Sequence, residues 1–347
     1  MNSALVLSHK HHLLPVAHRL RLEGVDVEVA TWRGVVKEGA HKPKENRFDR
    51  AWEGVMGRVM RSAEITQHAV EGMVDLARDG KTAVLTSAVG ASKMFSEAAR
   101  LLPRIEPEMT PQGPLRLGAW WNGEAFVGLH MLYADQTTWP MGIGPGPEGA
   151  MALVRIDDPE LHELFHGAAG EVSRMLGGIR FRGLVQLGLF LDAADGKIQI
   201  RGGELGWPWL HTHAFLSELE NLSAVVLEDE APVISKRFTV VVPVTMPPWP
   251  WQDGKAEEVP IKGLTTQKQG QVFWHDVHMK DGELWTAGLD GLVGVCRGAA
   301  NTPELARAKA LADAVAIELP SKQFRPDAVQ SLSAQLAMLE EAFGVVV

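Results

Sequence analysis

The pattern of apolar and polar residues in the first ninety residues predicts strands that alternate with helices. Residues 4–7 (ALVL) form a short apolar run, residues 12–22 place apolar side chains at helical spacing, and residues 25–32 (VDVEVATW) alternate as a strand does. Residues 64–79 fit a second helix, and residues 81–87 (KTAVLTS) fit the next strand. Strand–helix–strand units of this length predict a parallel sheet, so we expect an N-terminal α/β layer.

The middle of the chain predicts strands joined by turns. The Asn-Gly pair at 122–123 lies between two apolar runs and predicts a hairpin, whereas residues 140–151 form a Gly/Pro-rich loop without helical or strand period. Residues 158–176 fit a helix, and residues 183–193 (GLVQLGLFLDA) fit a buried strand. We therefore expect a mixed central sheet with helices.

The C-terminal part predicts further strands and two helices. Asn301 or Thr302 can cap a helix with Pro303 at its first position. The expected apolar face of this helix consists of Leu305, Ala308, Leu311 or Ala312, and Val315. A last amphipathic helix is expected from Asp327 onward.

Composition and charge narrow the classes of protein. The chain has 347 residues, which suits two or three packed subdomains, and its net charge of −9 does not favour nucleic acid as a partner, although it leaves it possible. No window approaches the roughly 20 apolar residues of a membrane helix, and the N-terminus lacks the flanks of a signal peptide. A single cysteine, Cys296, excludes an internal disulfide and a multi-cysteine zinc site, so we expect a cytoplasmic protein without a membrane partner.

Common catalytic motifs do not appear in the sequence. It contains no G-x-S-x-G, Walker A, H-E-x-x-H or C-x-x-C pattern. Cys296 lies in an apolar strand, which favours a core position over a nucleophile.

Several segments, in the right order, resemble glycinamide ribonucleotide synthetase (phosphoribosylamine–glycine ligase), a family of the ATP-grasp superfamily. These segments are GMVDLARDGKTAVLTS (72–87), GASKMFSEAARLLP (90–103), GAWWNGEAFVGLHMLYAD (118–135), IGPGPEGAMALV (143–154), FRGLVQLGLFLDAADGKIQI (181–200), FWHDVHMKDGELWTAGLDGLVGVCRG (273–298) and FRPD (324–327). Order and spacing, rather than any one motif, carry the resemblance.

The resemblance implies an α/β fold of three parts. These are an N-terminal pre-ATP-grasp (Rossmann-like) subdomain at residues 1–92, a truncated ATP-grasp α+β domain at residues 93–235 and a C-terminal β-rich and helical subdomain at residues 236–347. Fold likeness does not transfer chemistry, so the functional positions need separate comparison.

The positions that handle nucleotide and metal depart from the family. The family places Glu and Asn two residues apart on the strand after the Asp-Gly turn, and here these positions are Ile200 and Gly202, with Glu204 the nearest carboxylate. Only residues 104–113 stand where the family has its lysine-bearing strand and glycine-rich loop. We expect ATP and magnesium to bind weakly or not at all, and no other cofactor is assigned.

The resemblance also implies a substrate site formed by three loops, at residues 8–15, 144–151 and 203–213. In the first loop the family's phosphate-gripping glycines are replaced, and a basic turn at a helix N-terminus can still hold an anion. The expected substrate-binding residues are Lys10, His11, His12, Gly149, Met151, Gly206, Trp207 and Trp209.

Glu204, His211 and His213 are the expected catalytic residues. By residue type they could also hold a divalent metal if the His-x-His pair lies on one strand face, but ordinary polar packing is favoured, so no metal ligand is assigned. Trp207 and Trp209 replace charged residues of the family, and simple packing competes with stacking on a flat ligand ring.

Three functions compete, with an enzyme favoured. The first is transfer of glycine or another small amine, without ATP, to an anionic acceptor (phosphorylated or nucleotide-like) that already carries a leaving group. The second is an ATP-dependent carboxylate–amine ligase with a rebuilt site. The third is a non-catalytic binding or assembly protein, a pseudoenzyme, on the same scaffold. The acceptor and the oligomeric state remain open.

Overall fold

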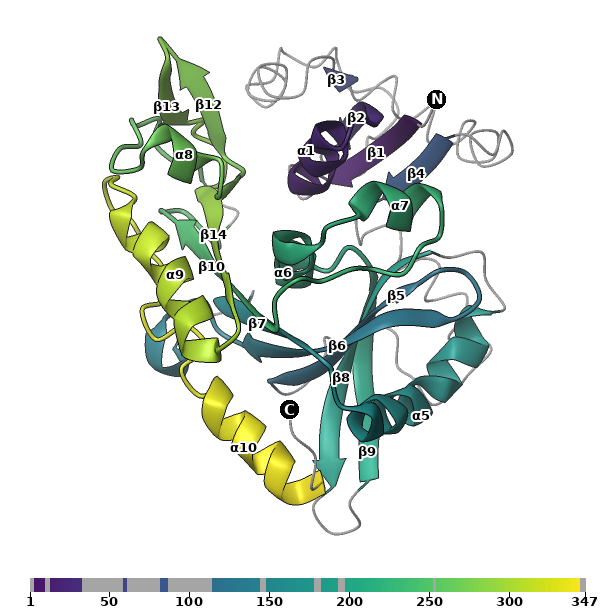
Figure 1. Cartoon of the computed structure of the whole chain (residues 1–347). Coiled ribbons are helices and arrows are strands. Elements are labelled where there is room, and N and C mark those ends of the chain that lie inside the picture. The colour runs from purple at the N-terminus through teal and green to yellow at the C-terminus, as the bar shows by residue number, and fades with distance from the viewer. Residues whose placement is uncertain are drawn as a thin grey trace.

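In the described part of the chain, the computed structural model contains two large β-sheets and a separate two-stranded hairpin (Figure 1). The structure describes residues 3–9, 13–32, 59–60, 82–86, 114–143, 148–177, 182–192, 197–251 and 254–343. Lys10, His11, His12 and the helix expected at residues 64–79 lie outside these described residues.

Among the described residues, the first sheet has four parallel strands. They are β1 (Ser3–His9), β2 (Asp26–Trp32), β3 (Val59–Met60) and β4 (Thr82–Thr86), in the order β3-β2-β1-β4. Ala4 pairs with Val27 on one side and with Ala83 on the other. The predicted parallel α/β layer is therefore confirmed for the described residues, with α1 (Leu14–Leu22) as the first crossover helix.

In the ranges that the structure describes, the second sheet has eight strands in the order β11-β14-β10-β7-β6-β5-β8-β9. They are β5 (Leu115–Trp121), β6 (Phe126–Asp135), β7 (Ala150–Arg155), β8 (Gly183–Asp192), β9 (Lys197–Gly206), β10 (Phe238–Thr245), β11 (Phe273–Trp274) and β14 (Leu292–Ala300). Every neighbouring pair is antiparallel, so the expectation of a mixed sheet was wrong. Strands from both sides of residue 235 share this sheet; the division into three subdomains stays a prediction.

The turn between β5 and β6 follows the Asn-Gly prediction. The side-chain oxygen of Asn122 accepts backbone N–H groups from Glu124 at 3.0 Å and Ala125 at 2.8 Å. Gly123 has φ +102°, which glycine adopts without steric penalty. The hairpin prediction is confirmed.

Helices cover the outer face of the large sheet. They are α5 (Pro159–Leu176), α9 (Pro303–Ala316) and α10 (Leu332–Phe343), which bury a core with side chains such as Phe165, Val240 and Leu332 (Figure 1). The short elements are α8 (Thr266–Gln269), the 3-10 turn η1 (Pro140–Gly142) and a hairpin of β12 (Val277–Lys280) with β13 (Glu283–Thr286). No helix in the described part of the chain is long and apolar enough to cross a membrane.

The face of α9 that packs against the sheet differs from the face that the sequence predicted. The Thr302 cap is confirmed, since its side chain accepts the N–H of Leu305. However, Leu305 and Val315 are 52% and 62% exposed, and Leu311 is only partly buried. The fully buried residues of the helix are Ala306, Ala310, Asp313 and Ala314. Small side chains let the helix approach β14 closely, because a Cβ on Gly298 would lie only 2.2 Å from the Ala306 carbonyl oxygen.

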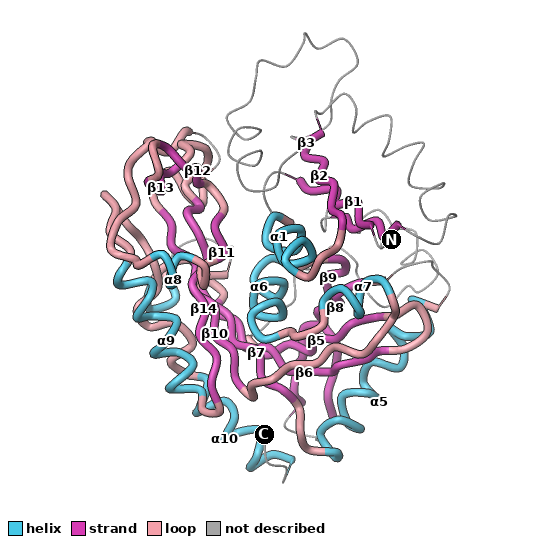
Figure 2. The backbone as a smooth tube through the Cα atoms, turned by 45° about the horizontal axis from the view of Figure 1, so that its top comes forward, coloured by secondary structure: helices cyan, strands magenta, loops and turns pink. Residues whose placement is uncertain are grey.

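The inner face of the large sheet packs against the N-terminal layer through α6 (Trp209–Glu218) and α7 (Leu222–Leu227) (Figure 2). One apolar core joins Val6 of β1, Phe215 of α6 and Leu153 of β7. A hydrogen bond also links α1 to α7: the Glu23 carboxylate, at the end of α1, accepts the backbone N–H of Ser223 at 2.7 Å. The two sheets are thus joined through α6 and α7.

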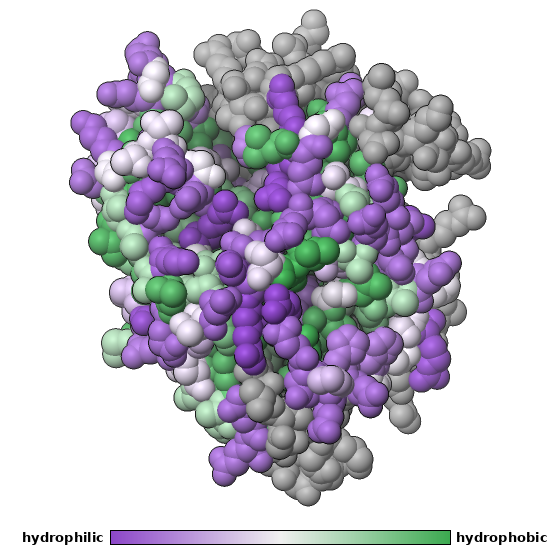
Figure 3. Space-filling model, in the orientation of Figure 1, coloured by the Kyte–Doolittle hydropathy of each residue, from purple (hydrophilic) through white to green (hydrophobic). Residues whose placement is uncertain are grey.

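The described surface is mixed in character. On the face seen in Figure 3, hydrophilic residues cover most of the described surface, and hydrophobic residues form small groups between them. Single apolar side chains such as Met141 (83% exposed) and Trp251 (57% exposed) are of the kind that protein surfaces commonly show.

Candidate functional site

Buried polar side chains gather on the inner face of the large sheet, beneath α6. Strands β5, β6 and β8 are mostly apolar, and each has one strongly polar residue in its interior. These residues are Arg116 in β5, His130 in β6 and Gln186 in β8. Each of these is at most 1% exposed. Because side chains alternate between faces, all three share the inner face with Trp120 and Leu132 of the core beneath α6.

Glu204 of β9 joins this group from the next strand. It pairs with Gln186 across the β8–β9 ladder, and the Gln186 side-chain amide donates to its carboxyl group at 3.1 Å. Burial raises the pKa of Glu204 to about 7; the nearby Glu148 carboxylate adds to this rise, and Arg116 opposes it. Glu204 can therefore take up or release a proton near neutral pH.

Arg116 and Glu148 form the ion pair of the site. The Arg116 Nη1 donates to Glu148 Oε1 at 2.7 Å, and both side chains are largely buried. Among the described residues, three buried polar atoms around this pair have no hydrogen-bond partner: Arg116 Nε, Gln186 Oε1 and His211 Nδ1. Buried polar atoms are usually satisfied, so this part of the site has capacity for water or a ligand.

His211 is paired with His130 rather than with Glu204. His130 Nδ1 lies 2.7 Å from the Gly128 carbonyl oxygen and so must donate to it, which leaves His130 Nε2 to accept from His211 Nε2 at 2.7 Å. Burial lowers the pKa of His130 to about 4. The pKa of His211 is also lowered, mainly by burial and then by His130 and Arg116, so both imidazoles are neutral at physiological pH.

The two histidines of the His-x-His motif lie on a helix, not on one face of a strand as expected. Each residue of an α-helix is rotated by about 100° about the helix axis relative to the one before it. His211 and His213 are two positions apart and therefore point to different sides of α6. His213 Nε2 lies 2.8 Å from His275 Nε2, and His213 Nδ1 donates to the Trp209 carbonyl oxygen at 3.0 Å. In the described ranges, no three His, Cys, Asp or Glu side chains lie close enough to hold a metal ion.

A small pocket opens beside the Arg116–Glu148 pair. Its walls include Trp139, Glu148, Trp209, Trp249, Gln323 and Phe324. The rings of Trp209 and Trp249 are inclined at 40° with their centroids 6.0 Å apart. The pocket therefore combines aromatic walls with one carboxylate.

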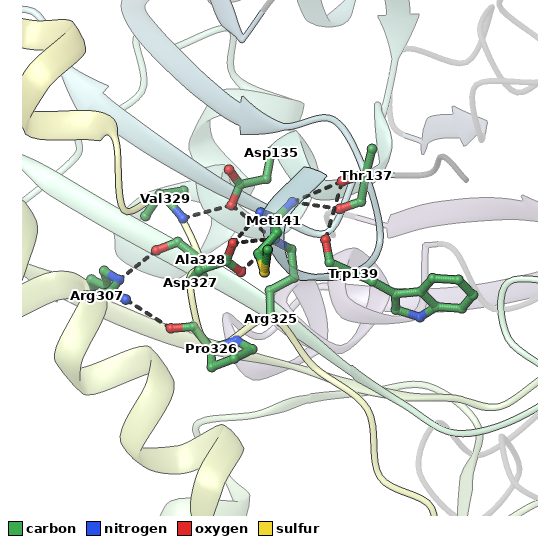
Figure 4. Close-up of polar contacts among 10 residues, drawn as sticks. All are labelled: Asp135, Thr137, Trp139, Met141, Arg307, Arg325, Pro326, Asp327, Ala328 and Val329. Atoms are coloured by element: carbon green, nitrogen blue, oxygen red, sulfur yellow. Dashed lines mark hydrogen bonds and ion pairs between the residues drawn. The ribbon is translucent and has the colours of Figure 1, made fainter. Parts of the chain in front are cut away.

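A charged network holds the loop that carries Trp139 (Figure 4). Arg325 makes a bidentate ion pair with Asp327, at 3.1 and 2.9 Å, and donates to the Thr137 carbonyl oxygen at 2.9 Å. Asp327 accepts the Met141 N–H at 2.8 Å. The FRPD segment (324–327) therefore holds the loop through hydrogen bonds at both Thr137 and Met141. In Figure 4 the indole of Trp139 extends away from this network.

Asp135 completes the network from the end of β6. Its carboxyl group accepts the Val329 N–H at 2.7 Å and lies 3.7 Å from Arg325 Nε. Gly149 lies against the same network, since a Cβ there would be 2.2 Å from the Thr137 carbonyl oxygen and 2.3 Å from Arg325 Cδ. Only glycine permits this close approach of the loop that leads into β7.

The remaining predicted substrate residues differ in their surroundings. Gly206 ends β9 with φ +101°, and Trp207 packs on Trp120 with ring centroids 5.6 Å apart. Met151 is 1% exposed and packs in the core beneath α6. Their substrate roles stay predictions, as do those of Lys10, His11 and His12.

Helix α6 lies next to the elements into which the predicted loops lead. It contacts α1, which follows the first loop, and β7, which follows the second, and it is itself the end of the third. The views in Figures 1 and 2 agree on this arrangement.

The sequence reasoning missed most of the site's polar partners. Arg116, His130 and Gln186 had a usable signal, namely one polar residue inside an otherwise apolar strand. Glu148 and Trp249 lie in Pro-rich segments without period, which carry no such signal. Cys296 is buried as expected, and burial raises the pKa of its thiol.

Sequence comparison does not place the chain in a family: no family model matches it, and no curated protein matches it significantly. Structure comparison shows the fold. The parallel N-terminal layer followed by the antiparallel sheet with α6 beneath it is the fold of the ATP-grasp ligases, and the expected fold class is confirmed.

Solved ligase structures match nearly the whole chain. Phosphoribosylamine–glycine ligase from Thermotoga maritima has a TM-score of 0.53 at 17% identity, covering 94% of this chain and 100% of that chain. Phosphoribosylglycinamide synthetase from Anaerococcus prevotii has a TM-score of 0.53 at 10% identity, with coverages of 91% and 98%. N5-carboxyaminoimidazole ribonucleotide synthetase from Thermotoga maritima has a TM-score of 0.50 at 10% identity, with coverages of 92% and 99%. At these identities the likeness concerns the fold.

The residues at the expected metal positions do not fit magnesium. Ile200 lies within β9, paired with Leu189, and Gly202 follows on the same strand, so neither position has a side-chain oxygen. Of the nearest carboxylates, Glu148 is paired with Arg116, and Glu204 is held by Gln186.

Proposed function

We propose that this protein transfers a small amine, such as glycine, to an anionic acceptor that already carries a leaving group, without ATP. The observation that carries the proposal is Glu204, a partly buried carboxyl group beside the Arg116–Glu148 pair, whose pKa is raised to about 7, mainly by loss of contact with water. An amine is bound as an ammonium ion and becomes nucleophilic only after it loses a proton. A carboxylate that titrates near neutral pH suits that task.

The reaction needs no redox partner. Ionised Glu204 takes one proton from the ammonium group, and the free amine nitrogen attacks the electrophilic carbon of the acceptor. The new C–N bond forms as the bond to the leaving group breaks, and the phosphate-type leaving group departs with the electron pair. The second amine proton passes to solvent. The protein contributes orientation and a water-poor surrounding, which together account for several kcal/mol of barrier lowering in other systems.

The test is transfer of isotopically labelled glycine without ATP. The protein is incubated with labelled glycine and a panel of sugar phosphates and nucleotides, and products are detected by mass gain together with phosphate or pyrophosphate release. Removal of the base by Glu204→Gln should lower the rate by about 100-fold or more. The matched control is Glu257→Gln, an exposed glutamate far along the chain, which should leave the rate unchanged.

Each outcome decides between the three functions. Product without ATP, lost in Glu204→Gln, supports the proposal. Product that forms only with ATP and magnesium overturns it in favour of an ATP-dependent carboxylate–amine ligase with a rebuilt site. An absence of product under all conditions, together with no binding of glycine, overturns it in favour of a binding or assembly protein.

A further inference from the structure

The pocket beside Glu148 has the chemistry of a small cation site. Trp209 and Trp249 line it with rings whose centroids are 6.0 Å apart, and Trp139 lines it from the loop after β6. Aromatic faces carry negative potential and attract ammonium groups, most strongly when the cation is removed from water.

The charged groups beside the pocket also favour a bound cation over a bound anion. Glu148 lines the pocket and is ion-paired with Arg116, whereas Glu204 lies behind it, is held by the Gln186 amide and feels the charges of both. When both carboxyl groups are ionised, the buried group is one positive charge short. A bound ammonium ion supplies that charge, whereas a bound anion would increase the imbalance.

The size of the pocket limits the occupant. The space between the tryptophan rings, Thr245 and Phe324 is narrow and largely enclosed, with room for one group about the size of a water molecule or an ammonium head. It admits the head of a small alkylammonium ion more readily than a sugar phosphate or a nucleobase. The larger acceptor of the proposed reaction must then bind outside this pocket.

We propose that Trp139, Trp209, Trp249 and Glu148 form the specificity site for the ammonium group of the amine substrate. The inference rests on the proposed function and names the residues that select its amine. The Arg325–Asp327 pair holds the loop of Trp139 in place through Thr137 and Met141, so one wall is formed before the ligand arrives.

The experiment measures binding of ethylammonium chloride by isothermal titration calorimetry, with ethanol as the neutral probe of similar size. The protein should bind ethylammonium and not ethanol. Trp249→Leu should weaken ethylammonium binding by about tenfold. Its control, Trp251→Leu, changes an exposed tryptophan two residues away and should stay within about twofold of the unchanged protein.

A second pair of variants tests the carboxylate. Glu148→Gln should weaken ethylammonium binding by about tenfold or more, whereas Glu124→Gln, in the exposed β5–β6 turn, should not. Circular dichroism checks that Glu148→Gln folds, because it leaves the buried Arg116 unpaired; if it does not fold, Trp249→Leu decides alone.

The inference and the proposed function can fail separately. Equal binding of ethanol and ethylammonium, or full binding by folded Trp249→Leu, overturns the inference. The labelled-glycine transfer assay still judges the proposed function in that case, since an amine bound elsewhere could be transferred. Ethylammonium binding that Trp249→Leu weakens supports the inference even if no transfer is found.

Discussion

Glu204 couples the acid–base chemistry of the site to folding. Its folded pKa of about 7 lies above its ordinary value of 4.5. Below pH 4.5 the group is neutral in both states, so its contribution to stability is fully present there. As the pH rises toward 7, the unfolded chain ionises first, and this contribution is lost.

We therefore expect Glu204→Gln to reduce the fall in stability with pH. Relative to the unchanged protein, the variant should gain on the order of 2 kcal/mol in free energy of unfolding between about pH 5 and about pH 8. Urea unfolding at both pH values measures this difference. Parallel pH dependence in the two proteins would contradict the raised pKa.

Gly118 provides the space in which His130 and His211 meet. A Cβ at this position would lie 2.2 Å from His130 Nε2 and 2.9 Å from His211 Nε2. We expect Gly118→Ala to cost about 2 kcal/mol of stability, because neither buried ring can move without losing its partner. Thermal unfolding followed by circular dichroism is the measurement.

Gly167→Ala is the control for this substitution. Gly167 lies in α5, and a methyl group added there would have nothing within 4 Å, so alanine should raise stability by about 0.5–1 kcal/mol. Similar changes in thermal stability for the two substitutions would show that Gly118 is not required by close packing against His130 and His211.

At the scale of elements, α9 shows that a helix need not bury its largest apolar residues. Its alanine face lies against β14, where Gly298 allows the backbones to approach. Leu305 and Val315 point outward and contribute little to the core. Close packing of alanines replaces most of the predicted face, of which Leu311 still packs partly against the core.

This packing predicts unequal effects of substitutions along α9. Ala310→Leu should destabilise the protein by about 3 kcal/mol because it forces the helix away from the sheet. Leu305→Ala should cost less than about 0.5 kcal/mol. Urea unfolding of both variants tests the assignment, and a larger loss for Leu305→Ala would contradict it.

At the scale of the whole molecule, Arg325 joins the C-terminal segment to the loop after β6. It is 5% exposed and lies between Asp135 and Asp327. Arg325→Met leaves the largely buried Asp135 without its cation and should cost about 3 kcal/mol, measured by urea unfolding. The comparison is Arg182→Met, which breaks the exposed pair with Asp229 and should cost less than about 0.5 kcal/mol.

The nucleotide prediction also concerns the whole chain. Because Ile200 and Gly202 offer no side-chain oxygen to a metal, ATP with magnesium should leave the melting temperature unchanged at ligand concentrations up to several millimolar. A dose-dependent rise with ATP–magnesium, absent with magnesium alone, would show that the site has been rebuilt with other ligands.

Features set by neighbouring residues were predictable from sequence. The strand–helix–strand order, the Asn122 turn and the Thr302 cap each depend on a few consecutive residues and on backbone geometry. The ATP-grasp fold followed from the order of segments that resemble one family. Such signals are local or sequential, so no knowledge of distant contacts is needed to find them.

Only the tertiary structure decided which distant residues meet. The sequence suggested Glu204, His211 and His213 as one group, yet α6 turns the two histidines toward His130 and His275 on separate strands and loops. The ion pair of Arg116 with Glu148, 32 residues apart, depends on how β5 is placed relative to the residues that lead into β7. Side-chain periodicity states which face a residue takes, but the partner on that face is determined by strand register and helix packing, which arise from the whole chain at once.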